Sequence, residues 1–332
     1  MTFAHRQSAH CESGVVANML SLKGLPMSEP MAFGLASALA FAYIPLIKLS
    51  GMPLIAYRMP PGYILKGIQK QLGVRFVRHT YRDADRGMRA LDELLDTQGM
   101  VGLQAGVFWL PYFPPQMQFH FNAHNLIVYG REGNEYLISD PVFETTTRCE
   151  AGALRQARFA KGALAARGLA YYPQNIPQEI DYAKKIPAAI RANFRTMTKA
   201  PLPVIGIRGI RYLAKNIVAL GKQPERRKHL NLYLGHIVRM QEEIGTGGAG
   251  FRFLYASFLR ESAKLLHGTA SSDLLAQASM QLTDAGDEWR RFALQASKMS
   301  RDRQPMDTQL LTQTLNGVAD REAAVWQLLK DI

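Results

Sequence analysis

Three residues of the chain, Cys11, His124 and Asp140, have the types and the order of a nucleophilic triad. Cys11 stands where a polar segment changes into an apolar, helix-forming one. The first turn of a helix favours a thiolate, because its unpaired backbone N–H groups carry partial positive charge. A thiolate can attack an acyl carbon while an imidazole transfers the proton and a carboxylate orients the imidazole. The pattern therefore predicts acyl chemistry, with Cys11 as nucleophile, His124 as base and Asp140 as orienting acid.

Two predicted strands would bring His124 and Asp140 together. His124 begins an apolar strand, Asp140 ends the next one, and residues 131–134 between them form a turn. An antiparallel hairpin places the start of one strand beside the end of the other. The alternative is that Cys11 is a small buried hydrophobe, His124 a hydrogen-bonded strand-end residue and Asp140 a turn former before proline.

The length of 332 residues suits two domains. We expect an α+β fold, with a mixed domain over residues 1–150 and a mostly α-helical domain over 151–332. In the first domain we expect helices at 61–73 and 87–97 and strands at 74–77, 100–108 and 168–172, the last closing the sheet. Two cysteines exclude a disulfide framework, so Cys149 is incidental. A reducing, cytoplasmic setting fits best, and the first residues do not resemble a signal peptide.

The segment 31–47 contains no charged residue and is borderline in length for a membrane span. Its glycine, serine and proline favour a buried helix followed by a loop instead. The same residues could form the wall of a tunnel for an apolar acyl group, and Tyr43 is a candidate substrate contact there.

An aromatic loop, residues 109–121, directly precedes His124. It holds three prolines, which forbid regular structure, and five aromatic residues. Such a loop suits the rim of a substrate channel, with Trp109, Tyr112, Phe113 and Phe121 as contacts. A loop folded onto the second domain is the alternative.

A glycine-rich segment, residues 245–250, could be mistaken for a phosphate-binding loop. It lacks the lysine of such loops and follows no strand. It is either a tight corner between two helices or a site where Gly247 and Gly248 let the backbone approach the active site. In the second case Arg252 would contact the substrate.

The net charge of +13 indicates an acidic partner. An acidic protein is the best match for this charge. Nucleic acid is the second alternative, but no binding motif supports it, and peripheral contact with an anionic membrane surface is the third. The basic residues that would form the docking face are Lys184, Lys185, Arg191, Arg195, Lys199, Arg208, Arg211, Lys215, Lys222, Arg226, Arg227 and Lys228.

Several motifs resemble the butirosin biosynthesis protein H family. They are His10-Cys11, Gly34, Phe41-Ala42-Tyr43, Ala123-His124-Asn125, Ser139-Asp140-Pro141 and the helical-domain segment 243–259. The resemblance implies a papain-like N-terminal domain related to bacteriocin-processing cysteine peptidases. It also implies transfer of an acyl group from an acyl-carrier protein to an amine, without a metal or other cofactor of the enzyme's own. The carrier protein would then be the acidic partner, and Arg252 would contact its phosphopantetheine arm. On this resemblance the nucleophile, base and orienting acid fall on Cys11, His124 and Asp140.

The chain departs from the papain-like pattern at the oxyanion-stabilising glutamine. That residue usually lies about six positions before the cysteine, where this chain has His5, and Gln7 lies four before it. The Cys11 N–H would supply one donor, and Gln7, His5 or His10 the other. A thioesterase or peptidase with the same triad is the alternative function, and a docking module without catalysis is a third.

Overall fold

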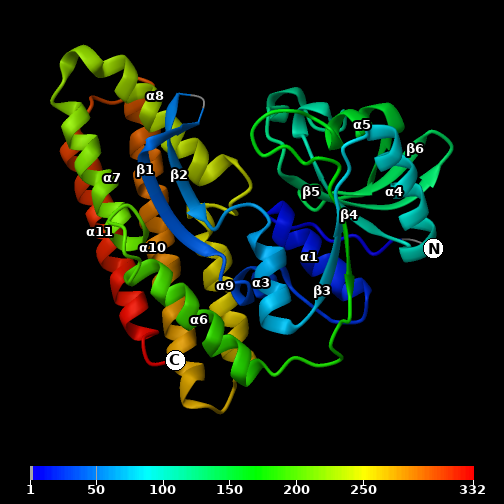
Figure 1. The fold of residues 1–332 in the computed structure, drawn as a ribbon. Helices are drawn as coiled ribbons and strands as arrows, with labels where there is room; N and C mark the ends of the chain where they lie inside the picture. Colours follow the sequence, from blue (N-terminus) through cyan, green and yellow to red (C-terminus); the bar gives the residue numbers. More distant parts are fainter. Residues whose placement is uncertain (1–2, 50) are drawn as a thin grey trace. The chain divides into compact units, whose positions relative to one another are not determined.

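The computed structural model describes residues 3–49 and 51–332, which fold into two compact units (Figure 1). Unit 1 comprises the chain up to Ala32 together with Ile64–Ile180, and unit 2 comprises Phe33–Tyr63 and Asp181–Ile332. The α+β prediction is confirmed. The expected boundary at residue 150 differs from this division, since residues 151–180 belong to unit 1 and residues 33–63 to unit 2.

Unit 1 is built on a six-stranded antiparallel sheet of order β3-β8-β4-β5-β6-β7. Its strands are β3 (Arg75–His79), β4 (Val101–Ala105), β5 (His124–Glu132), β6 (Glu135–Ser139), β7 (Thr147–Glu150) and β8 (Ala170–Gln174). Its helices are α1 (Cys11–Leu22), α3 (Tyr63–Leu72), α4 (Ala84–Gln98) and α5 (Ala151–Arg158), and α2 (Glu29–Leu35) crosses the division between the units. Helices α4 and α5 share one hydrophobic core with β4, β5 and β6, whereas α1 packs against β5 and β8.

The strand predicted at 168–172 is present as β8. It pairs with both β3 and β4 and so lies between them in the unit 1 sheet, which is why unit 1 extends beyond residue 150. The helices expected at 61–73 and 87–97 are present as α3 and α4. Asp83 caps the start of α4 by accepting a hydrogen bond from the Arg86 N–H, and Gly99 ends it with a φ of 73°.

The uncharged segment 31–47 is helical only at its start, in α2. The prediction of a loop after that helix is wrong. Residues Leu39–Leu49 form β1, which pairs with β2 (Met52–Arg58) in an antiparallel hairpin. The β-branched and aromatic residues of both segments favour such a strand pair. Among the described residues, no helix is both long and apolar enough to cross a membrane.

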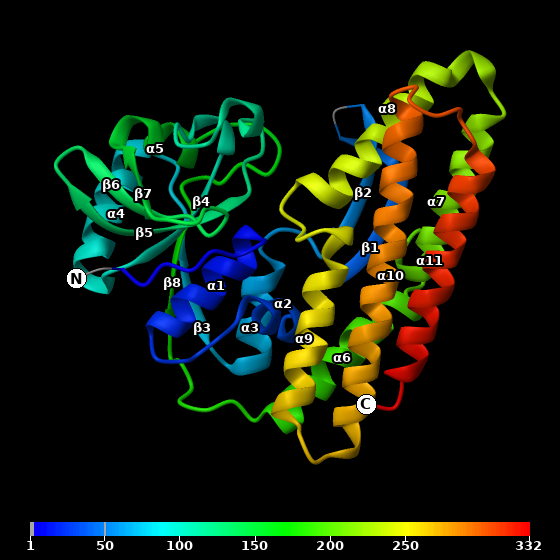
Figure 2. The same cartoon turned by 180° about the vertical axis from the view of Figure 1, so that it is seen from behind.

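Unit 2 surrounds this hairpin with long helices. These are α6 (Tyr182–Thr198), α7 (Gly206–Gly221), α8 (Arg227–Val238), α9 (Arg252–Leu265), α10 (Ala270–Ser300) and α11 (Thr308–Leu328). Figures 1 and 2 show α10 lying alongside α9 and α11, and α7 lying alongside α11. The helical character expected after residue 150 is therefore concentrated in residues 181–332.

A buried ion pair holds the centre of unit 2. The Arg252 Nε donates to Glu322 Oε1 over 2.8 Å, and neither side chain has solvent-exposed surface. The Trp289 indole N–H donates to the same oxygen over 2.7 Å, and Arg252 Nη1 donates to the Gly250 carbonyl. These bonds join α9, α10 and α11 to the glycine-rich segment. Removing one partner of such a pair leaves an uncompensated charge in the core.

We expect Glu322→Gln to destabilise unit 2 by about 3–5 kcal/mol, because the Arg252 guanidinium would keep its charge without a carboxylate. Urea denaturation followed by circular dichroism measures this loss. Asp320→Asn is the matched control, since Asp320 on the same helix forms an exposed ion pair with Arg211 and should contribute less than about 1 kcal/mol. Equal losses in the two variants would contradict the role of the buried pair.

Candidate active site

Cys11 is the first residue of α1, at the end where backbone N–H groups are unpaired. His10 precedes it in an extended conformation, and its Nδ1 accepts a hydrogen bond from the Ser13 N–H over 3.3 Å. The Glu29 carboxylate accepts the N–H groups of Ala9 and His10 over 2.9 and 2.7 Å. Hydrogen bonds of residues before and after Cys11 therefore fix the turn that carries the thiol.

A close approach between α1 and the end of β6 depends on Gly14, one turn after Cys11. A Cβ at this position would lie 2.6 Å from Ser8 and 2.8 Å from Pro141. The Ser8 N–H also donates to the Pro141 carbonyl over 2.6 Å. The residue after Asp140 can therefore lie against the first turns of α1 only because position 14 has no side chain.

His124 and Asp140 meet as the hairpin prediction requires. β5 begins at His124, β6 ends at Ser139, and His124 Nε2 lies 2.7 Å from Asp140 Oδ2. The His124 side chain is 4% exposed and the Asp140 side chain is fully buried. The predicted turn at 131–134 joins the two strands, with a φ of 58° at Gly133.

The thiol of Cys11 lies within hydrogen-bonding reach of His124. Burial alone would lower the pKa of His124, but the Asp140 carboxylate and the Cys11 sulfur raise it from 6.5 to about 10. These interactions favour the cationic imidazole, with Nε2 donating to Asp140 and the other ring nitrogen available for the sulfur. The structure thus brings the three predicted triad residues together.

The aromatic loop supports the triad from the side of Asp140. The Tyr112 hydroxyl donates to Asp140 Oδ2 over 2.9 Å, and the Val142 N–H donates to Oδ1 over 3.2 Å. The ring of Phe113 meets the His124 ring edge-on with 5.2 Å between centroids. Burial, followed by the charge of Asp140, raises the pKa of Tyr112 well above its ordinary value.

These positions correct part of the predicted substrate contacts. Tyr112 and Phe113 hold the triad residues, and Phe113 is buried in the core of unit 1. Trp109 is 39% exposed and Phe121 is half-buried, so these two stay candidate contacts. The prolines of the loop do not exclude all regular structure, since 3-10 helices occur at Val107–Trp109 and Pro115–Met117.

The candidates for the second oxyanion donor differ in their surroundings. His5 Nε2 donates to the Phe143 carbonyl over 2.9 Å, which leaves Nδ1 to accept from the Ser139 hydroxyl over 2.8 Å. Both ring nitrogens are thus used, and His5 is excluded. The His10 ring caps α1. Gln7 is exposed, beside the residue that bonds to Pro141, and stays a candidate.

Four predicted substrate contacts, Tyr43, Arg252, Gly247 and Gly248, belong to unit 2. Arg252 is fully buried against Glu322, so its predicted contact with the substrate is wrong. Tyr43 is 2% exposed and packs against two other tyrosines, Tyr212 and Tyr233. These side chains stabilise the interior of unit 2.

The glycine-rich segment is a tight corner before α9. The φ angles are 68° and 86° at Gly247 and Gly248, then 50°, 56° and 69° over the residues Ala249–Phe251. Five consecutive residues thus have a positive φ, which is a costly conformation for the two that are not glycine, Ala249 and Phe251. The Gly248 N–H donates to the Thr246 hydroxyl and the Ala249 N–H to Glu242. These N–H groups are satisfied internally and cannot cradle a phosphate.

Sequence reasoning missed two acidic residues near the nucleophile. One is Glu29, described above. The other is Glu12, which is fully buried and accepts the N–H groups of Ile64 and Leu65 at the start of α3 over 2.9 and 3.3 Å. The sequence signal for Glu12 was its position, next to the cysteine at the N-terminus of an apolar helix. A carboxylate buried there requires hydrogen-bond donors.

The second cysteine differs from the first in its surroundings. Cys149 is a free, buried thiol in the core of unit 1. Burial, followed by the charges of Glu150 and Glu135, raises the pKa of Cys149 to about 12. Within the part of the chain that the structure describes, no cluster of histidine, cysteine and acidic side chains could hold a metal ion.

Two family models match successive parts of the chain. Residues 10–141 match the family model described as Butirosin biosynthesis protein H, N-terminal, and residues 152–329 match the model described as Domain of unknown function (DUF4872). A crystal structure from Bacillus anthracis, described as a C39-like peptidase, is similar with 13% identity and a TM-score of 0.37, covering 53% of this chain and 96% of that one. No curated protein matches the chain. Because the second model spans more than half of the residues, the chain belongs to the family described as Domain of unknown function (DUF4872), joined to an N-terminal domain of the butirosin biosynthesis protein H type.

Proposed function

We propose that this protein is a cysteine-dependent acyltransferase. It would move an acyl group from an acyl-carrier-protein thioester through a Cys11 thioester to an amine acceptor. The observation that carries the proposal is the buried cluster of the Cys11 thiol, a cationic His124 and Asp140 at the head of α1. The family model that matches this part of the chain is named for a biosynthetic protein, which suits amide formation better than degradation.

The reaction would proceed in two acyl transfers. The Cys11 thiolate attacks the thioester carbonyl, and His124 gives its proton to the departing carrier thiol. The amine then attacks the Cys11 thioester, loses its proton to His124 and releases Cys11 as the amide forms. The Cys11 N–H would donate to the oxyanion in both steps, with the Gln7 side chain as the second donor.

Burial of the triad supports transfer over hydrolysis. The Cys11 side chain is 7% exposed, and Phe113 covers one edge of the His124 ring. A thioester formed in such surroundings meets little water before the acceptor arrives. A thioesterase or peptidase would use the same three residues, so the fate of the thioester decides between the two functions.

The charge of unit 2 supports a carrier protein as donor. Arg226 and Lys228, at the start of α8, are exposed, and Arg227 pairs with Asp302. An acidic carrier would be attracted by this face, because complementary fields speed association and orient docking. The acyl chain and the amine would be recognised separately, near the triad.

The proposal is tested by intact-mass spectrometry with acyl-carrier thioesters. We expect an acyl adduct on the wild-type protein that persists without acceptor and is discharged by an amine. Cys11→Ala should show no adduct and lose turnover by at least about a thousandfold, while Cys149→Ala, the matched control, keeps both. An adduct that hydrolyses equally fast with and without amine would favour the hydrolase, and turnover by Cys11→Ala would contradict covalent catalysis.

Removing the Tyr112 hydroxyl should slow the reaction without unfolding the protein. Tyr112→Phe keeps the ring but deletes one hydrogen bond to the Asp140 carboxylate, and we expect kcat/KM to fall about tenfold. Tyr129→Phe is the control, because Tyr129 lies on the same strand as His124 but stacks on Phe3. Steady-state kinetics with one carrier thioester measures both, and an unchanged rate for Tyr112→Phe would refute the positioning role.

The raised pKa of His124 makes stability depend on pH in a defined window. The stabilisation from charged His124 is complete below about pH 6.5 and is lost as the pH rises through about 10. In Asp140→Asn the neutral amide no longer raises this pKa, so the loss with pH should be shallower than in the wild type. Urea denaturation across this range compares the two proteins, and parallel profiles would be inconsistent with the His124–Asp140 interaction.

A further inference from the structure

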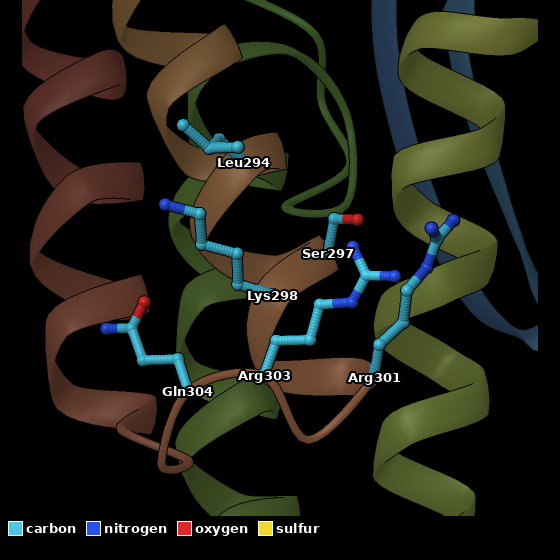
Figure 3. Close-up of a pocket in the computed structure, with 6 residues that line it drawn as sticks. All are labelled: Leu294, Ser297, Lys298, Arg301, Arg303 and Gln304. Carbon is cyan, nitrogen blue, oxygen red and sulfur yellow. The ribbon is translucent and has the colours of Figure 1, made fainter.

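An open cavity of about 330 Å³, lined mostly by exposed side chains, lies at the surface of unit 2 where α10 ends and the chain turns towards α11 (Figure 3). Its volume is at the lower end of the range for small-molecule pockets, about 300–1,000 Å³. None of the residues assigned to acyl transfer lines it. The lining residues are Leu294, Ser297, Lys298, Arg301, Arg303 and Gln304.

The lining carries three positive charges and no carboxylate. In the described part of the chain, no ion pair joins Lys298, Arg301 or Arg303 to an acidic side chain. Asp302 lies between the two arginines in sequence, but its carboxylate accepts a hydrogen bond from Arg227 of α8 over 3.0 Å. The charge of Asp302 is therefore balanced by Arg227, and the cavity keeps its positive potential.

The two arginines leave the turn on the same side. Figure 3 shows Arg301 and Arg303 extending in the same direction, with the Ser297 hydroxyl turned towards Arg303 and with Lys298 and Gln304 on the side of α11. Asp302 has a φ of 54°, which turns the chain sharply between the two arginines. Two planar guanidinium groups and a hydroxyl thus offer several N–H and O–H donors to one space.

We propose that this cavity binds a phosphate group, supplied either by a free phosphate or by the headgroup of an anionic lipid. Guanidinium groups bind phosphate oxygens through paired, charge-assisted hydrogen bonds, and a phosphate dianion would offset the mutual repulsion of the two arginines. Basic residues at a helix C-terminus also interact favourably with the helix dipole. That interaction, however, needs neither a cavity nor the convergence of two arginines.

Isothermal titration calorimetry with inorganic phosphate, at constant ionic strength, tests the site in the full chain. We expect saturable binding by the wild type that weakens at least about tenfold in Arg303→Gln and in Arg301→Gln, because each loses charge-assisted hydrogen bonds. Arg303→Lys, which keeps the charge without the planar fork, should bind with intermediate affinity. Arg260→Gln is the matched control, since it removes one exposed positive charge from α9, outside the cavity.

Sedimentation with phosphatidylcholine vesicles, with and without phosphatidic acid, distinguishes the two sources of phosphate. Capture only by the phosphatidic acid vesicles, lost in Arg303→Gln but kept in Arg260→Gln, identifies a lipid headgroup. Saturable binding of inorganic phosphate without vesicle capture identifies a free phosphate. If the wild type binds neither probe, or if Arg303→Gln and Arg260→Gln bind equally well, the proposal is overturned.

Discussion

The buried charge of Asp140 is the constraint on which the architecture of unit 1 depends. A carboxylate without solvent needs a full set of donors, since an unpaired buried charge costs several kcal/mol. Its donors come from three segments, namely His124 at the start of β5, Tyr112 in the aromatic loop and the Val142 N–H after β6. The hairpin, the loop and the strand end must therefore be placed together, and the imidazole that faces Cys11 is oriented as a result.

Much of this cluster could be predicted from the sequence because its geometry is local. His124 and Asp140 are 16 residues apart, and a hairpin turn joins the strands that carry them. The change from polar to apolar, helix-forming residues at Cys11 predicts a helix start, and α1 begins at this residue. Residue type and strand periodicity were enough for these three positions, and also for the helical character of residues 181–332.

The buried charged residues that support the fold could not be predicted this way, because their partners lie far away in sequence and no periodicity indicates the pairing. Glu12 bonds to the start of α3 more than 50 residues later, and Arg252 pairs with Glu322 across 70 residues. The division of the chain was missed for the same reason. The family models meet between residues 141 and 152, yet β8 returns to unit 1 and the β1–β2 hairpin joins unit 2.

This interleaving has a consequence for how the chain folds during synthesis. The sheet of unit 1 is incomplete until β8 emerges from the ribosome, because among the described residues β3 pairs with β8 alone and is connected to β4 through it. Residues of the β1–β2 hairpin are synthesised early, but α7 and other helices that pack against them are synthesised later. The apolar side chains of the hairpin stay uncovered until then. A two-stranded hairpin alone is marginally stable in water. The nascent chain therefore carries the uncovered apolar residues of this segment until α6 and α7 have been synthesised, and aggregation and chaperone binding compete with folding during that time.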